Sequence, residues 1–214
     1  MPRILKVDPH QRDYMALRPA VMSLLHGEVV AGPTQTFYGL MASADQPEAI
    51  KRVMELKNRA PNKPLLLLLD RALRVGCYAR YEPYSYKLLA KHFWPGPLTI
   101  LLEAHPGQHP ALIGPRETVG LRVEGLPVIR ALVRTLDRAV TGTSANPAGE
   151  PPALTPEEVI NYFGDNVDLI IDGGPCPGGK PSTLIDASTT PPRLLRDGPL
   201  SLDELLAVIP DLRT

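Results

Sequence analysis

Five consecutive leucines at residues 65–69 constrain the fold of this chain more than any other segment. Pro64 and Asp70 bound the run, and its length suits one β-strand. A strand with one solvated face alternates apolar and polar residues, whereas this run shows no alternation. Both faces of the strand must therefore be covered by other parts of the chain.

Helical and strand patterns alternate along the rest of the sequence. Thr155, followed by Pro156 and two acidic residues, is a strong helix start. We therefore predict one α/β domain over residues 1–214, with a core at about 12–205 and helices packed on a mixed, twisted sheet. Helices, with their caps, are predicted at 8–26, 47–57, 84–92, 127–135, 155–163 and 201–208. Strands are predicted at 28–31, 65–69, 98–102, 119–123, 139–143, 167–171, 182–186 and 193–196.

Charge balance and apolar pattern exclude several classes of protein. The 23 Lys and Arg residues balance the 23 Asp and Glu residues, which argues against a globally basic nucleic-acid binder, although a local basic patch is compatible with it. No run of about 18 apolar residues occurs, so no membrane span is predicted. Cys77 and Cys176 stand alone, without histidines at zinc spacing, so we predict neither a disulfide scaffold nor a metal site. Residues 1–6 lack the apolar stretch of a signal peptide, and we expect a soluble, cytoplasmic protein.

One glycine-rich segment has the spacing of a phosphate-binding loop. Residues 174–180 fit GxxxxGK and follow a predicted strand. Pro181 comes next, however, where such a loop has Ser or Thr to bind Mg²⁺. A phosphate loop also needs a helix after it, because the helix N-terminus helps to bind the phosphate, and residues 182–186 are predicted as a strand. We therefore interpret the segment as a connection between strands.

Three other polar segments are candidates for binding an anionic ligand. Lys57, Arg59 and Lys63 lie between a predicted helix and the leucine strand, where they either bind a polyanion or form a solvated helix end. Residues 141–147 offer hydroxyls and an amide after a predicted strand, which suit a phosphate, a ribose or a carboxylate but also suit an ordinary turn. Residues 32–40 combine two threonines with aromatic residues, either as part of a site or as a structured turn.

Taken in order, these segments resemble the YrdC/YciO family, whose best-known members are threonylcarbamoyl-AMP synthases. The resemblance covers residues 5–205, and its specificity comes from the order and spacing of motifs that are individually weak. The matching motifs are Pro33-Thr34-x-Thr36-x-Tyr38-Gly39-Leu40, Lys57-x-Arg59, Trp94-Pro95-Gly96-Pro97-Leu98-Thr99, Gly120-x-Arg122, Thr143-Ser144-Ala145-Asn146, Ser182-Thr183 and Leu194-Leu195-Arg196-x-Gly198.

The resemblance implies a fold, a reaction and partners. The fold is an open, twisted mixed sheet flanked by helices around a deep cationic cavity. The reaction converts ATP, L-threonine and bicarbonate into threonylcarbamoyl-adenylate and pyrophosphate, and a partner enzyme transfers the threonylcarbamoyl group to tRNA. Since two anions have to meet, fixed cations must offset their repulsion. Mg²⁺ is expected on the ATP phosphates because no carboxylate cage is visible in the motifs.

Matching positions also carry over the family's functional residues. The residues implied to bind the nucleotide phosphates and to form the catalytic set are Lys57, Arg59, Ser144 and Asn146. Further residues implied on the nucleotide side are Lys63, Thr118 and Arg196. The residues implied to bind the amino-acid substrate are Thr34, Thr36, Arg122, Thr143 and Ser182.

Some positions depart from the family pattern and keep two alternatives open. Gln35 stands where many members have an acid, and Leu68 where longer members have a histidine that contacts threonine. Residues 170–174 and 180–183 resemble the YciO branch more closely. One alternative is therefore a YciO-like protein that binds a nucleotide but acts on another carbamoyl or acyl adenylate. The other is a non-catalytic module that binds tRNA or double-stranded RNA in the cationic cavity.

Overall fold

The structure is a computed structural model that describes residues 1–10 and 13–214. Its α-helices are α1 (Arg18–Leu25), α2 (Pro47–Leu56), α3 (Tyr84–Phe93), α4 (Pro127–Leu136), α5 (Pro156–Phe163) and α6 (Leu202–Val208). Its strands are β1 (Arg3–Lys6), β2 (Val30–Gly32), β3 (Gly39–Met41), β4 (Leu67–Leu69), β5 (Leu98–Glu103), β6 (Thr118–Val123), β7 (Val140–Thr141), β8 (Thr143–Ser144), β9 (Leu169–Asp172), β10 (Thr183–Asp186) and β11 (Arg193–Arg196). Short 3-10 helices are η1 (Ala72–Cys77), η2 (Pro110–Leu112) and η3 (Gly164–Asn166).

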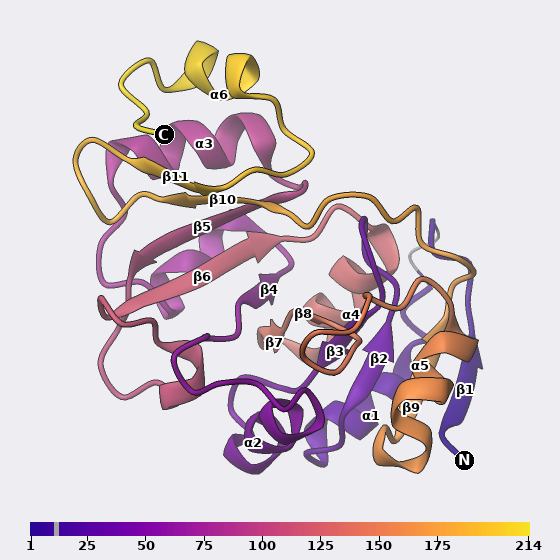
Figure 1. Cartoon of the computed structure of the whole chain (residues 1–214). Helices are drawn as coiled ribbons and strands as arrows, with labels where there is room; N and C mark the ends of the chain where they lie inside the picture. Colours follow the sequence, from indigo (N-terminus) through magenta and orange to yellow (C-terminus); the bar gives the residue numbers. More distant parts are fainter. Residues whose placement is uncertain (11–12) are drawn as a thin grey trace.

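The strands form two mixed sheets with helices packed around them, as Figure 1 shows. One sheet has the order β1-β9-β2-β3-β8, and the other has the order β11-β10-β5-β6-β4-β7. Both contain parallel and antiparallel pairs, for example β1 parallel to β9 and β2 antiparallel to β3. The predicted α/β class with mixed pairing is confirmed, but the strands divide between two sheets where one was expected.

The division between the sheets falls at Gly142. The segment predicted as one strand over 139–143 is split into β7, which pairs with β4, and β8, which pairs with β3 of the other sheet. The Gly142 backbone N–H donates to the Leu66 carbonyl at 2.8 Å. A Cβ on Gly142 would lie 2.6 Å from Leu68 Cγ and 2.7 Å from a methyl carbon of Leu66. Only glycine lets the chain pass this closely between the sheets.

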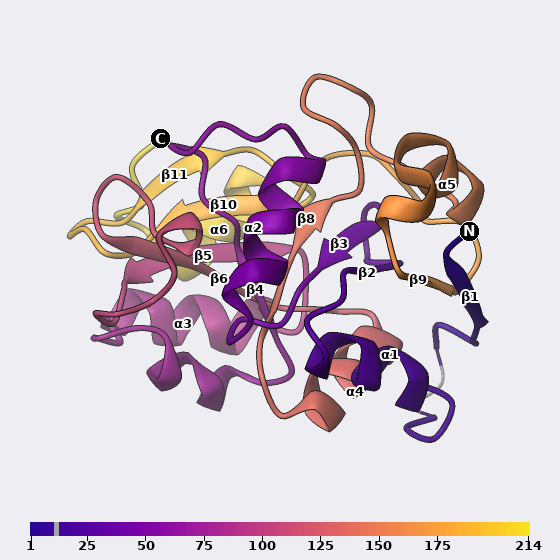
Figure 2. The same cartoon turned by 90° about the horizontal axis from the view of Figure 1, so that it is seen from below.

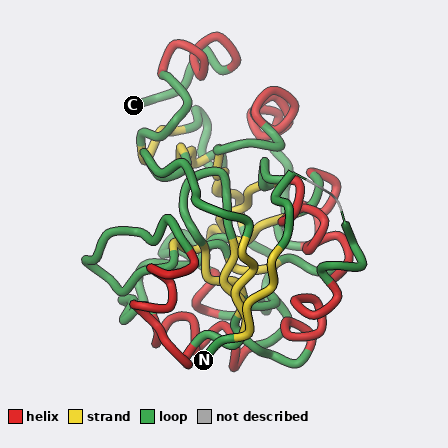
Figure 3. Tube along the Cα trace, turned by 90° about the vertical axis from the view of Figure 1, so that its right-hand side faces the viewer, coloured by secondary structure: helices red, strands yellow, loops and turns green. Residues whose placement is uncertain are grey.

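The leucine strand is covered on both faces, as its lack of alternation predicts. Leu67 and Leu69 belong to the larger apolar cluster, whereas Leu68 belongs to a second cluster with residues of α1 and α4. Figure 2 shows α1 and α4 side by side, and Figure 3 shows helices on both sides of the central strands. The strand therefore joins two cores, because alternate side chains along it point to opposite faces.

Differences from the prediction concentrate at the N-terminus. The first described helix begins at Arg18, and the predicted helix entry from residue 8 includes residues 11 and 12, which lie outside the described part, as does the predicted core boundary at 12. Two strands were not predicted: β1, which pairs with β9, and β3, which lies inside a segment interpreted as a loop. Among the described helices, none has the length and apolar character needed to cross a membrane.

Candidate functional site

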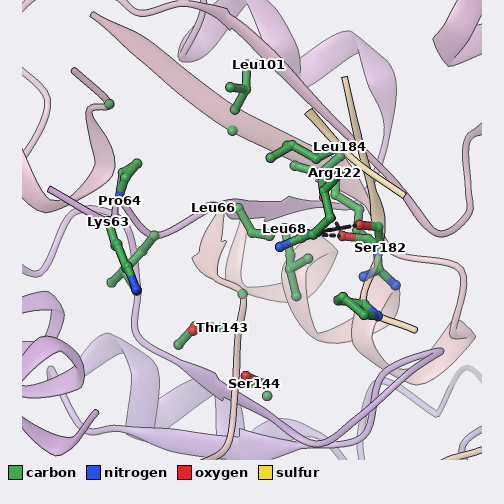
Figure 4. Close-up of a pocket in the computed structure, with 18 of the residues that line it drawn as sticks. Lys63, Pro64, Leu66, Leu68, Leu101, Arg122, Thr143, Ser144, Ser182 and Leu184 are labelled. Carbon is green, nitrogen blue, oxygen red and sulfur yellow. Dashed lines mark hydrogen bonds between the residues drawn. The ribbon is translucent and has the colours of Figure 1, made fainter. Parts of the chain in front are cut away.

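A cavity of about 480 Å³ is lined by residues of both sheets and of their connecting loops. The turn between β2 and β3 contributes Thr34 and Thr36, and β8 contributes Ser144. From the other sheet, Arg122 on β6 and Arg196 on β11 line the cavity. Figure 4 shows Lys63 and Pro64 across the space from Arg122 and Ser182, with Thr143 and Ser144 at its lower side. Motifs far apart in the sequence therefore meet at one site.

The structure brings most of the predicted site residues to this cavity and leaves two outside its lining. Lys57 and Asn146 are the two that do not line it. The predicted residues that line it are Thr34, Thr36, Arg59, Lys63, Thr118, Arg122, Thr143, Ser144, Ser182 and Arg196.

The charged side chains of the lining are all cations. Arg59, Lys63, Arg122 and Arg196 line the cavity, and among the described residues no aspartate or glutamate lines it. Burial lowers the pKa of Arg59, and nearby Arg196 lowers it further. Burial also lowers the pKa of Arg196, with Arg122 adding to the effect. Neighbouring cations that repel one another favour binding of an anion that relieves the repulsion.

Arg196 is held against Ser182, the residue that precedes β10. Its Nε and Nη2 donate to the Ser182 carbonyl at 3.1 and 2.9 Å, and Nη2 also lies 3.3 Å from Ser182 Oγ. Ser182 Oγ in turn lies 2.8 Å from Thr99 Oγ1. These contacts fix the direction of the guanidinium and join it to two hydroxyls at the cavity wall.

Arg59 shapes the loop between α2 and β4. Its Nε donates to the Lys63 carbonyl at 2.7 Å, and its Nη2 donates to the Pro64 carbonyl at 3.0 Å. The loop folds around the guanidinium, so Arg59 and Lys63 reach the same cavity as neighbouring cations. The alternative of a freely solvated helix end therefore does not describe Arg59, whereas Lys63 lines the cavity with an exposed side chain.

Lys57 lies behind the cavity wall and ties α2 to the segment that follows β8. Its side chain is buried, and Nζ donates to the Asn146 carbonyl at 2.7 Å, to Asn146 Oδ1 at 3.1 Å and to the Ser144 carbonyl. The Ala148 N–H donates back to the Lys57 carbonyl at 2.8 Å. Burial lowers the pKa of Lys57 to about 7, and Arg59 contributes to the shift. Direct contacts from Lys57 and Asn146 to a phosphate stay a prediction.

The turn that contains Thr34 and Thr36 is stabilised by its own hydroxyl. Thr34 Oγ1 accepts from the N–H groups of Thr36 and Phe37 at 3.2 and 3.3 Å and donates to the Phe37 carbonyl at 2.7 Å. Such threonine turns occur where a hydroxyl replaces a backbone partner. The lining threonines are thus presented by a rigid turn.

The glycine-rich segment 174–180 supports this turn and has no helix after it. The next described element is the strand β10, so the interpretation as a connection between strands is confirmed. The Gly178 N–H donates to the Thr36 carbonyl at 2.9 Å, and the hydroxyl of the buried Tyr38 donates to the Gly174 carbonyl at 2.8 Å. The segment therefore buttresses the wall near Thr36.

Sequence reasoning missed two parts of the site. One is the apolar wall, to which Leu66, Leu101 and Leu184 contribute. The other is Glu124, which is fully buried and lies 2.7 Å from the Arg122 guanidinium. Its signal was available, because residues two apart on a strand point to the same face. The described residues contain no group of three or more His, Cys, Asp or Glu placed to hold a metal ion.

Two mixed sheets around a cavity of cations and hydroxyls define an α/β protein whose cavity has the charge that suits an anionic ligand. A family model named Sua5_yciO_yrdC, with the description "Telomere recombination", matches residues 23–198. The chain belongs to the Sua5/YciO/YrdC family. The resemblance found in the motifs is thereby confirmed.

Relatives named threonylcarbamoyl-AMP synthase support the same assignment. A protein of Pyrococcus abyssi named threonylcarbamoyl-AMP synthase is 35% identical over 197 residues, which cover 92% of this chain and 58% of the relative. A protein of the same name from Marinobacter nauticus is 33% identical over 183 residues, which cover 85% of this chain and 96% of the relative. The chain spans little more than half the length of some curated relatives, 58% and 55% in two cases.

Solved structures agree with the fold. The crystal structure of Pyrococcus abyssi Sua5 complexed with L-threonine has a TM-score of 0.92 and 34% identity and covers 98% of this chain and 62% of that one. The crystal structure of Escherichia coli YciO has a TM-score of 0.86 and 26% identity and covers 96% of this chain and 100% of that one. Both branches of the family thus share the arrangement seen here.

Proposed function

We propose that this protein is a threonylcarbamoyl-AMP synthase, which forms threonylcarbamoyl-adenylate and pyrophosphate from ATP, L-threonine and bicarbonate. The observation that carries the proposal is the cavity itself, which holds four cations and a set of hydroxyls with no acid in its lining. The synthase name of relatives at 33–35% identity and the L-threonine complex of a protein with the same fold support the choice of substrates.

The charge of the cavity suits the proposed chemistry. The threonine amine takes up CO₂ as a carbamate, and a carbamate oxygen then attacks the α-phosphate of ATP with pyrophosphate as the leaving group. Both reactants are anions, and negative charge develops further in the transition state. Fixed cations that are oriented before the reaction lower this barrier without needing to rearrange.

Two groups of residues divide the work in this proposal. Arg59 and Lys63 bind the phosphates, with Thr118 and Ser144 as neutral donors beside them. The turn of Thr34 and Thr36, together with Arg122 and Ser182, binds the carboxylate and hydroxyl of threonine. Thr143 completes the substrate side. Arg196 joins the nucleotide side, and its charge lowers the pKa of nearby Arg59.

Lys57 and Asn146 act on the nucleotide side through the loop that carries Ser144. Their mutual hydrogen bonds fix the backbone of this loop relative to α2. Mg²⁺ enters with ATP and neutralises part of the phosphate charge. The product is an activated acyl adenylate in water, so a partner enzyme that transfers the threonylcarbamoyl group to tRNA must receive it before hydrolysis.

The test is the release of pyrophosphate by the purified protein supplied with ATP, L-threonine, bicarbonate and Mg²⁺. We expect release that stops when either L-threonine or bicarbonate is omitted. ATP binding without threonine-dependent release would contradict the proposal and favour a YciO-like activity on another carboxylate. RNA binding that survives Arg59→Ala, with no pyrophosphate release by the wild type, would favour the RNA-binding alternative.

A further inference from the structure

We propose that Glu124 is a positioning residue that sets the amino-acid half of the cavity by holding Arg122 and the Thr34–Thr36 turn together. The inference rests on the proposed function and names a residue outside the cavity lining. Glu124 follows the end of β6 (Thr118–Val123), and its side chain is fully buried. A buried carboxylate requires partners, so its contacts indicate what it organises.

One carboxylate oxygen faces the cationic wall. Glu124 Oε2 lies 2.7 Å from Arg122 Nη2, and the Arg122 side chain is 5% exposed. Among the described residues, Arg122 Nε and Nη2 have no hydrogen-bond partner, so the contact of Nη2 with Glu124 is an ion pair, and Arg122 lines the cavity. The acid thus anchors one side of the guanidinium and leaves a buried donor for a ligand anion.

The other carboxylate oxygen holds the turn. Glu124 Oε1 accepts from the Gln35 backbone N–H at 3.1 Å and from the Leu126 N–H at 3.2 Å. Gln35 is the central residue between Thr34 and Thr36, both of which line the cavity. One side chain therefore fixes the distance between the turn and Arg122, which belong to different sheets or their connections.

The partners of the two carboxylate oxygens need different properties of the side chain. A substitution can therefore distinguish a positioning role from packing alone. The backbone donors need only an acceptor, which the amide oxygen of glutamine also supplies. Arg122 needs the charge, because a charge-assisted pair is shorter and stronger than a neutral one. Glu124→Gln therefore keeps the acceptor for the turn and the size of the side chain, but removes the anchor of Arg122.

The experiment measures the Kd of L-threonine and of ATP by calorimetry for wild type, Glu124→Gln and Glu124→Asp. We expect Glu124→Gln to raise the Kd of L-threonine about tenfold or more, because a buried ion pair loses one of its charges, and to change that of ATP less than about twofold. Glu124→Asp keeps the charge, so it should bind L-threonine more tightly than Glu124→Gln. The KM for L-threonine should rise in the same order.

Asp70→Asn is the matched control. Asp70 is also a fully buried carboxylate, paired with Arg74 at 2.6 Å, but Arg74, unlike Arg122, does not line the cavity. Loss of the Asp70 charge should lower thermal stability without changing the ratio of the Kd of L-threonine to that of ATP. Equal weakening of both ligands in Glu124→Gln, or threonine binding as tight as in wild type, would overturn the positioning role alone. A wild-type protein that binds ATP but no L-threonine would overturn the proposed function and the substrate named here with it.

Discussion

Lys57 shows how a motif residue can serve a site without lining it. Its ammonium group has acceptors from Ser144 and Asn146, and its own carbonyl accepts from Ala148. Three donors on an ammonium group match this set of oxygens. The cost is burial of a cation, which appears as the lowered pKa of about 7.

This pKa predicts how stability depends on pH. The pKa of Lys57 is about 7 in the folded protein against 10.5 for an ordinary lysine, so above pH 7 the folded state binds fewer protons than the unfolded chain. Stability linked to Lys57 must then rise as the pH increases through this window, and the burial penalty is fully present below it. We expect the difference in free energy of unfolding between wild type and Lys57→Met to grow from pH 6.5 to 9.5, measured in urea. A difference that does not change with pH would contradict the lowered pKa.

The motifs predicted residues most of which line one cavity, but they could not predict the direction of each side chain. Lys57 and Arg59 are two residues apart at the end of one helix, and the sequence gives no reason why one turns inward to a loop and the other lines a cavity. Glu124 was missed for a related reason. The spacing of two residues from Arg122 could have indicated a shared face, but the contact of Glu124 with the turn of Gln35 depends on how the two sheets pack.

At the scale of elements, prediction worked where the local pattern itself forces the structure. The leucine run became β4 with two covered faces, and Thr155 caps α5 by accepting from the Glu158 N–H. Prediction failed where the structure of a segment depends on the strand with which it pairs. β1 pairs with a strand from the far end of the sequence, and residues 139–143 are divided at Gly142 because two different sheets compete for them.

Gly142 gives the prediction at this scale. Gly142→Ala would place a Cβ 2.6 Å from Leu68 Cγ, so β4 or the sheet crossing must move. We expect a loss of about 1–3 kcal/mol in the free energy of unfolding, as is typical of overpacked cores. Urea denaturation measures it, with Gly76→Ala as the control, because a Cβ there meets no atom closer than 3.7 Å. Equal free energies of unfolding for Gly142→Ala and Gly76→Ala would mean that the chain at residue 142 can accommodate a Cβ.

At the scale of the molecule, the cavity lies between the two sheets. Arg59, Arg122 and Arg196 come from widely separated segments and meet only in the folded state, where they repel one another. Family motifs predicted that they would share a site. The charge pattern of the linear sequence could not, since its net charge is zero and the cations are spread over distant segments.

An anion that occupies the cavity should therefore stabilise the whole protein. Pyrophosphate offsets the repulsion of the cations and contacts segments of both sheets, and a ligand at 100 times its Kd stabilises the native state by about 2.7 kcal/mol. We expect pyrophosphate to raise the melting temperature of wild type and to leave that of Arg59→Ala almost unchanged, although the variant folds.

The control is Lys51→Ala, which should respond like wild type. It removes an exposed cation of α2 that lies 4.0 Å from Glu55. Added salt should weaken the effect by screening, but the buried part of the site should retain most of it. If Arg59→Ala were stabilised as much as wild type, the phosphate side of the cavity would have to be assigned to other residues.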